Sequence, residues 1–260
     1  MKGFLIDLDG TLYKGKTSIP GADKFIRKLY EHDIPFMLVT NNSSRTTQGV
    51  SEHLESMGVH VEPENIYTSA QASARYLTEL HEGASVYAIG ENGLFRALEE
   101  KGLKLTSEHP QFVVQGINRK VTYDQLACAV QFILDGASFI LTNPDHLLPS
   151  DHVMLPGAGS IAALIEKATQ VKPVVIGKPS PIIMNFALEK IGLIPGEVCV
   201  IGDNLNTDIR GGRDTGCHTA LVLTGLTTED NKETLIKDTG VTPDFICKDL
   251  DDLWNQIMNG

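Results

Sequence analysis

Two aspartates that directly follow a short apolar run constrain this chain more than any other feature. Residues 4–6 read Phe-Leu-Ile, which is typical of a buried strand, and Asp7 and Asp9 come next. A turn or a helix cap would explain one such aspartate. Two neighbouring carboxylates repel each other and raise each other's pKa unless a cation lies between them. The pair therefore favours a cation site with a carboxylate nucleophile over a plain turn.

The rest of the 260-residue chain alternates between strand and helix patterns. Strands are expected at residues 4–6, 34–39, 66–68, 85–89, 112–114, 139–141, 174–176, 198–201, 220–223 and 245–246. Helices are expected at residues 22–32, from the 43–44 cap to 58, 70–80, 93–101, 122–134, 157–169, 180–192, 206–214 and 250–258. Continuous apolar strands that alternate with helices indicate βαβ units, so the fold class is α/β with a parallel sheet.

Composition limits the classes of partner. The length suits one large domain or two modest ones. A net charge of −11 argues against nonspecific nucleic-acid binding and against binding to an anionic membrane surface. The same charge would repel a phosphate substrate. A bound divalent cation, together with lysine or helix N-termini, would have to reverse the sign of the field at a phosphate site.

Targeting and metal-binding patterns add further expectations. The N-terminus begins with a strand rather than a signal peptide, and no apolar run approaches the roughly 18 residues that span a membrane, so a cytoplasmic protein is expected. The histidines lack the spacing of a zinc site. The cysteines are expected to be reduced residues of the core, because each lies in or beside an apolar stretch: Cys128, Cys199, Cys217 and Cys247.

Polar side chains follow three of the predicted strands. They are Asp7 and Asp9 after the first, Thr40, Asn41 and Asn42 after the second, and Asp203, Asn204 and Asp208 after residues 198–201. Ligands of open parallel sheets bind beyond the carboxyl ends of the strands. If the three strands are neighbours, these side chains surround one point. Carboxylate oxygens with few soft ligands suit Mg²⁺. Helix capping is the simpler alternative for the amides and for Asp203 or Asp208.

Lys178 is a candidate for binding an anion. It lies between Gly177 and Pro179, just before the helix that Ser180 and Pro181 are expected to begin. A lysine that points to such an N-terminal anion site would neutralise phosphate charge. The ordinary alternative is a solvated surface lysine.

A second motif competes for the first loop. Residues 10–17 fit the P-loop pattern GxxxxGK[ST] and follow a strand. A P-loop needs a helix that starts at its lysine. Pro20 and Gly21 would break that helix within its first turn, so the pattern is disfavoured.

Four segments, in this order, resemble the motifs of the haloacid dehalogenase (HAD) superfamily. They are Asp7 to Thr11, Val39 to Ser43, Gly177 to Pro179, and Gly202 to Asp208. The Thr-Asn-Asn-Ser form of the second motif resembles the NagD-like phosphatase branch. So do residues 142–145, 156–160 and 176–179, and the likeness covers nearly the whole chain.

This resemblance implies a domain organisation. A Rossmann-like catalytic core would be discontinuous, formed by residues 1–79 and 176–260. A smaller α/β cap of the C2 type would be inserted as residues 80–175. Within the cap, the stretch from Asp145 to Leu155 is expected to reach toward the leaving group. Members of the superfamily often associate through the cap, which leaves a homo-oligomer open.

The resemblance also implies roles for the site residues. Asp7 would attack phosphorus and form an aspartyl-phosphate, while Asp9 would act as general acid and then general base. Mg²⁺ would be held by the carboxylates of Asp7 and Asp203 and by the backbone carbonyl of Asp9. The side chains that would bind the phosphoryl group are Thr40, Asn41, Asn42 and Lys178. The residues that would support this site from behind are Asp208 and Asn204.

The expected function is a Mg²⁺-dependent phosphatase of small phosphorylated metabolites, such as sugar phosphates or nucleoside monophosphates. Asp9 favours phosphoryl transfer, because the haloalkanoate dehalogenases of the superfamily lack this second acid. One alternative is a P-loop ATPase. Another is a noncatalytic binding or regulatory protein on the same fold, although a binding module has no need of an acid beside a nucleophile.

Overall fold

The described residues form two compact units in a computed structural model that covers residues 1–149 and 153–258. The first unit is Met1–Thr40, Gly49–Tyr67 and Lys178–Gly260, and the second is Asn41–Gln48 and Thr68–Gly177. Residues 41–48 and 68–79 thus cluster with the second unit rather than with the predicted core. The domain boundaries at residues 79 and 176 stay a prediction.

The first unit contains a six-stranded sheet with the order β15-β14-β13-β1-β4-β5. Its strands are β1 Gly3–Ile6, β4 Phe36–Thr40, β5 Ile66–Thr68, β13 Val198–Gly202, β14 His218–Val222 and β15 Phe245–Cys247. The pairs from β4 through β15 are parallel. Strand β1 lies between β13 and β4, so the three strands that precede polar residues are neighbours, as the sequence analysis required.

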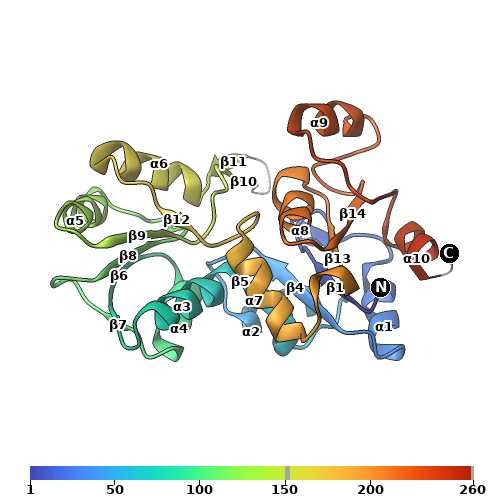
Figure 1. Ribbon diagram of the computed structural model, residues 1–260, viewed down its shortest axis with the longest axis horizontal. Helices are drawn as coiled ribbons and strands as arrows, with labels where there is room; N and C mark the ends of the chain where they lie inside the picture. Colours follow the sequence, from blue (N-terminus) through green and yellow to red (C-terminus); the bar gives the residue numbers. More distant parts are fainter. Residues whose placement is uncertain (150–152, 259–260) are drawn as a thin grey trace. The chain divides into compact units, whose positions relative to one another are not determined.

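Helices cover both faces of this sheet (Figure 1). On one face, α1 (Ala22–Glu31), α2 (Thr47–Glu55) and α10 (Leu250–Met258) contribute to a shared apolar core with the strands. Helices α1 and α10 meet through Phe25 and Trp254, whose rings pack edge to face with centroids 6.0 Å apart. On the other face, α7 (Pro181–Ile191) contacts β1, β4 and α8 (Arg210–Asp214). The carboxyl ends of the strands remain the place where polar side chains gather.

The second unit contains a parallel five-stranded sheet with the order β12-β9-β8-β6-β7. The strands are β6 Ser85–Ile89, β7 Lys104–Leu105, β8 Phe112–Gln115, β9 Ser138–Leu141 and β12 Val174–Val175. Its helices are α3 Ser69–Leu80, α4 Asn92–Glu100, α5 Tyr123–Leu134 and α6 Ala158–Thr169. Figure 1 shows α5 and α6 on one face, where they share an apolar core with the sheet, and α3 and α4 on the other. Both units are therefore α/β layers.

Several elements were not expected from the sequence. A hairpin of β2 (Tyr13–Lys14) and β3 (Thr17–Ser18) replaces the predicted irregular stretch, and it leaves no helix at Lys16 for a P-loop. A second hairpin joins β10 (Leu147–Pro149) to β11 (Met154–Pro156). Residues 150–152, in the stretch expected to reach toward the leaving group, lie outside the described residues.

Two helical predictions also differ in detail. Helix α9 (Lys232–Thr239) was missed because it buries none of its residues and so lacks a clear apolar face. The expected helix 206–214 is a π-helical turn, η3 (Leu205–Ile209), followed by α8. Two short 3₁₀ turns, η1 (Pro63–Asn65) and η2 (Pro195–Glu197), precede β5 and β13. No helix of the described chain is long and apolar enough to cross a membrane.

One cysteine prediction was wrong. Cys128 is exposed, whereas the other three cysteines are buried. It lies on α5, which buries Ala129 and Ile133 against the sheet, so its own side chain falls on a different face of the helix.

Candidate functional site

Three carboxylates from the first unit gather at the carboxyl ends of its central strands. Asp7 follows β1, where its backbone N–H donates to the carbonyl of Ile201 in β13 at 2.8 Å. Asp203 follows β13, and Asp208 lies in η3. One carboxylate oxygen from each of the three lies within 4.8 Å of the others. The sheet thus joins residues that are about two hundred positions apart in sequence.

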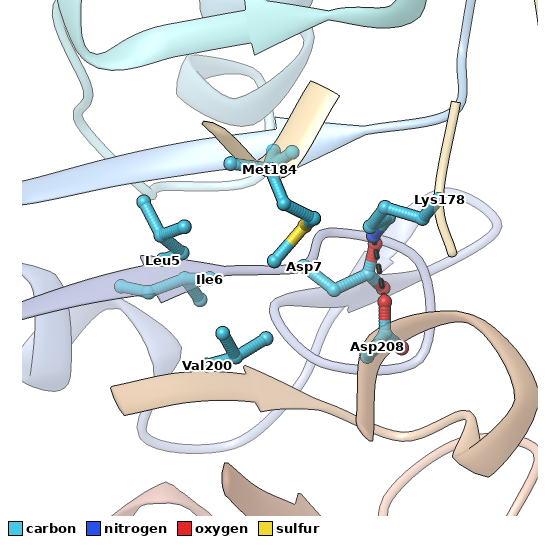
Figure 2. Close-up of a pocket in the computed structure, with 8 residues that line it drawn as sticks. Leu5, Ile6, Asp7, Lys178, Met184, Val200 and Asp208 are labelled. Carbon is cyan, nitrogen blue, oxygen red and sulfur yellow. Dashed lines mark hydrogen bonds and ion pairs between the residues drawn. The ribbon is translucent and has the colours of Figure 1, made fainter. Parts of the chain in front are cut away.

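Lys178 lies within this carboxylate group. Its ammonium donates to Asp7 Oδ1 and, at 2.7 Å, to Asp208 Oδ1 (Figure 2). The lysine is 3% exposed, so the alternative of a solvated surface lysine was wrong. Burial by itself would lower the pKa of Lys178, but the charges of Asp208 and Asp7 outweigh that effect and raise the pKa. The apolar side chains that line the same pocket are Leu5, Ile6, Val39, Met184 and Val200.

The carboxylates bear more negative charge than one lysine can balance. Burial raises the pKa of Asp7 well above its ordinary value, against the lowering by Lys178 and with added repulsion from Asp208 and Asp203. Burial and then repulsion from Asp208 raise the pKa of Asp203 to about 7. A divalent cation would favour the ionised forms, and clustered carboxylate oxygens are the donors that Mg²⁺ prefers. The residues present therefore fit such an ion.

The Asp203 side chain is held by a loop that the sequence analysis did not single out. The N–H of Leu226 donates to Asp203 Oδ2, and Thr224 Oγ1 donates to the carbonyl of Gly10 at 2.6 Å. A β-carbon on Gly225 would overlap the Asp203 carboxyl group and lie 2.6 Å from Gly10 Cα. Gly10 itself has a φ of 85° and also faces this carboxyl group. A glycine just after predicted strand 220–223 was the available signal.

Asp9 has a different environment from Asp7. Its side chain is exposed, and its Oδ2 accepts a hydrogen bond from the hydroxyl of Tyr13 at 3.0 Å. The group of three carboxylates that could hold a metal ion does not include the Asp9 side chain. The two aspartates of the first motif therefore have different surroundings, although they are two residues apart.

The polar residues after β4 divide between the two units. Thr40 ends β4 and is buried in the first unit. Asn41 begins the second unit, where its amide donates to both carboxylate oxygens of Asp145 at 3.1 and 3.2 Å. The carbonyl of Asn41 accepts from Ser69 Oγ at 2.7 Å and from Asn143 Nδ2 at 2.8 Å. Asn41 is thus firmly anchored within its own unit.

Asn42 and Asn204 both close local turns. Asn42 Oδ1 accepts from the N–H groups of Ser44 at 2.8 Å and Arg45 at 3.2 Å. Asn204 Oδ1 accepts from the N–H of Asn206 at 2.9 Å, so it caps η3. The sequence analysis named helix capping as the alternative for Asn42, but this side chain closes a turn before α2 begins at Thr47. Asn204 does cap a helical turn.

Asp208 connects several parts of the site. Its Oδ2 accepts from the N–H of Asn204 at 3.2 Å, while its Oδ1 binds Lys178. A β-carbon on Gly202 would overlap this side chain, so only glycine fits at the end of β13. Through its hydrogen bond to the ammonium, Asp208 consequently fixes the position of Lys178.

Comparisons with known proteins identify two matching family models and similar phosphatases. A family model described as haloacid dehalogenase-like hydrolase matches residues 4–104, and a second model of HAD-like hydrolases matches residues 175–253. An acid sugar phosphatase of Staphylococcus aureus is 44% identical over 252 residues, which cover 96% of each chain.

Two solved structures resemble the whole chain. A p-nitrophenyl phosphatase from Archaeoglobus fulgidus has a TM-score of 0.94 at 35% identity. The superposition covers 98% of this chain and 99% of the phosphatase chain. NagD from E. coli K-12 has a TM-score of 0.89 at 35% identity. The superposition covers 96% of this chain and 97% of the NagD chain.

Proposed function

Because this chain belongs to the haloacid dehalogenase-like hydrolases and is a phosphatase of the NagD-like branch, we propose that it hydrolyses small phosphate monoesters through an aspartyl-phosphate on Asp7. The observation that carries the proposal is the buried group of Asp7, Asp203 and Asp208 with Lys178 at the ends of β1 and β13. A nucleophile, a cation site and a fixed positive charge are the parts that phosphoryl transfer needs.

In the first step, a carboxylate oxygen of Asp7 attacks phosphorus as the bond from phosphorus to the leaving oxygen breaks. Asp9 gives its proton to that leaving oxygen, so the product leaves as a neutral alcohol. The ammonium of Lys178 and the hydroxyl of Thr40 stabilise the phosphoryl oxygens.

In the second step, water attacks the phosphorus of the aspartyl-phosphate. Asp9, now ionised, takes the proton from that water while the bond from phosphorus to the Asp7 oxygen breaks. Inorganic phosphate leaves, and Asp7 returns to its carboxylate form. The same group therefore serves as acid and then as base, and the two steps are balanced in protons.

Mg²⁺ would be held by the carboxylates of Asp7 and Asp203 and by the backbone carbonyl of Asp9. When bound, it supplies positive charge that neutralises the phosphoryl oxygens and the nucleophile. Gly225 and the Leu226 N–H hold Asp203 in place for this task. Asp208 and Asn204 act behind the site, where Asp208 fixes Lys178 and Asn204 caps the turn that presents Asp208.

The proposed substrates are small sugar phosphates or nucleoside monophosphates. The sugar phosphatase activity in the name of the Staphylococcus aureus relative supports the first class. We further propose that the second unit is the cap domain and that it contributes to substrate choice.

A panel of phosphorylated metabolites and p-nitrophenyl phosphate tests this proposal. Phosphate release is measured with Mg²⁺ and with a chelator, for the wild-type chain and for Asp7→Asn. We expect Mg²⁺-dependent release from monoesters that Asp7→Asn abolishes. Absence of release from every monoester would indicate a noncatalytic binding protein, and nucleoside triphosphate turnover that survives Asp7→Asn would indicate an ATPase.

A further inference from the structure

We propose that Tyr13 is a positioning residue for Asp9, and that its hydroxyl orients the carboxyl group for proton transfer to the leaving oxygen. The inference rests on the proposed function of Asp9 as acid and base. The observation behind it is the hydrogen bond from Tyr13 Oη to Asp9 Oδ2 at 3.0 Å. Tyr13 was not among the residues that the motifs singled out.

The ring of Tyr13 is fixed by packing. Only 5% of the residue is exposed, and it belongs to the apolar core of the first unit. Its ring meets the His53 ring edge to face, with centroids 5.2 Å apart and an interplanar angle of 82°. The hydroxyl is therefore a fixed point that contacts the exposed side chain of Asp9.

The backbone brings the two side chains together. The N–H of Gly10 donates to the carbonyl of Tyr13 at 2.7 Å, and the N–H of Tyr13 donates to the carbonyl of Leu8 at 3.2 Å. Asp9 and Tyr13 form a bridge, and Tyr13 then pairs with Ser18 in the hairpin of β2 and β3. Tyr13 therefore closes the loop that carries Asp9 and also binds the Asp9 side chain.

This contact has a chemical consequence. A carboxyl group has two oxygens, and a donor on Oδ2 fixes the plane of the group. The proton of Asp9 moves to the leaving oxygen as the ester bond breaks, and the carboxylate later accepts a proton from the attacking water. A well-aligned acid matters most where the leaving oxygen is strongly basic, because such an oxygen departs poorly as an anion.

The same hydrogen bond could have a purely structural role, because the hydroxyl of a buried tyrosine needs a hydrogen-bond partner. The two roles predict different kinetics. Loss of a structural contact lowers activity toward all substrates by a similar factor. Loss of acid alignment lowers kcat/KM in proportion to how much each leaving group depends on protonation.

The experiment compares Tyr13→Phe with the wild-type chain on a series of alkyl and aryl phosphates that ends with p-nitrophenyl phosphate. Because general acid catalysis contributes about 10²- to 10⁴-fold, we expect kcat/KM to fall roughly 10- to 100-fold for alkyl phosphates. For p-nitrophenyl phosphate, whose leaving group needs little protonation, we expect a fall of less than about threefold.

Tyr30→Phe is the matched control. Tyr30 is in the same unit, its ring packs on Phe36, and its hydroxyl bonds Asn65 and the N–H of Glu62. We expect it to leave the dependence on leaving group unchanged. If Tyr13→Phe does not fold, Tyr13→Met removes the hydroxyl with a more adaptable side chain.

An equal fall across the series, or no fall at all, would overturn the assignment of Tyr13. Failure of the underlying function gives a different result, because the wild-type chain would then release no phosphate or Asp7→Asn would remain active.

Discussion

Both units place polar side chains after the central strands of a parallel sheet, but one cluster is charged and the other is neutral. In the first unit, the carboxylates of Asp7, Asp203 and Asp208 surround the single ammonium of Lys178. In the second unit, the buried polar residues at the ends of β8 and β9, together with Ser43, carry only amides and hydroxyls. The residues of this neutral cluster are Ser43, Gln115, Thr142 and Asn143.

The neutral cluster forms hydrogen bonds within the second unit, although Gln115 Oε1 is buried without a partner. Thr142 Oγ1 donates to Ser43 Oγ at 3.2 Å, Asn143 Nδ2 donates to the carbonyl of Asn41 at 2.8 Å, and Gln115 Nε2 donates to the carbonyl of Gly116 at 2.6 Å. Hydrogen bonds of this kind stabilise the fold. In the charged cluster the carboxylates outnumber the lysine, and burial together with their mutual repulsion raises the pKa of Asp7 and Asp203. The comparison teaches that a buried cluster with surplus carboxylates must bind protons or a cation, whereas a neutral one needs neither.

The largest effect is expected from Asp7→Asn. Loss of the nucleophile should lower kcat at least about 10⁴-fold, by analogy with removal of a covalent nucleophile in other hydrolases. The metal-free variant should still fold, because one of the repelling carboxylates is gone. Steady-state kinetics and circular dichroism check both parts, with Asp23→Asn, an exposed partner of Arg27, as the control. Near-normal turnover by Asp7→Asn would contradict the covalent route.

A smaller effect is expected from Gly225→Ala, which places a methyl group against the Asp203 carboxylate. Mutation of a group that orients a metal ligand typically lowers the affinity for the metal by about 10- to 100-fold. Titration calorimetry with Mg²⁺ measures this directly. Gly196→Ala is the matched control, since a β-carbon there meets no atom within 4 Å. Equal Mg²⁺ affinity in the two variants would show that residues 224–226 do not contribute to Mg²⁺ binding.

Asn143→Ala tests the neutral cluster. The change leaves the carbonyl of Asn41 without one of its donors, so the free energy of unfolding should fall by roughly 1–3 kcal/mol. Mg²⁺ affinity should stay at the wild-type value, because the cation site is built from the first unit. Chemical denaturation and calorimetry give the two quantities. A loss of Mg²⁺ affinity without a loss of stability would break the contrast between the clusters.

A pH dependence of the metal-free protein is also expected. The pKa of Asp203 is raised to about 7, and that of Asp7 is raised as well, so between pH 5 and 7 the folded chain binds more protons than the unfolded chain. Its free energy of unfolding should therefore fall as pH rises, by at most about 1.4 kcal/mol per pH unit for each proton. His60, whose pKa is raised by its bonds to Glu55 and Glu62, adds a fall of the same sign near pH 7.

Asp203→Asn isolates the contribution of the carboxylate, because it leaves His60 unchanged. Denaturation with a chelator from pH 5 to 7 should show a flatter slope for this variant. Stabilisation by added Mg²⁺ should grow with pH in the wild-type chain, since the ligands must lose their protons. An identical slope in both proteins would show that Asp203 is ordinary in the metal-free fold.

Much of the fold could be predicted from local pattern. Predicted strands 4–6, 34–39 and 198–201 correspond to β1, β4 and β13, because continuous apolar runs ended by polar residues have few other structures. The hairpins were missed because strands of two or three residues carry too little periodicity. Helix α9 was missed because it has no buried face.

The candidate site was predictable in its residues but less so in its connections. The motif order identified Asp7, Lys178 and Asp203 from sequence. The contact of Tyr13 with Asp9 has no local signal, and for the approach of Gly225 to Asp203 the only signal is a glycine after the predicted strand 220–223. Such contacts depend on which loops meet when the strands align, and sequence spacing does not specify that.

The sequence by itself determined that carboxylates follow buried strands and that the strands form a parallel sheet, because hydrophobic periodicity and the poor fit of aspartate to strands act locally. Only the tertiary structure decided that β13 pairs with β1, which brings Asp203 and Asp208 to Asp7 and places a buried Lys178 among them. The physical reason is that burial and mutual repulsion arise from the packed surroundings of these groups, and those surroundings bring separate aspartates into a group that could hold a metal ion.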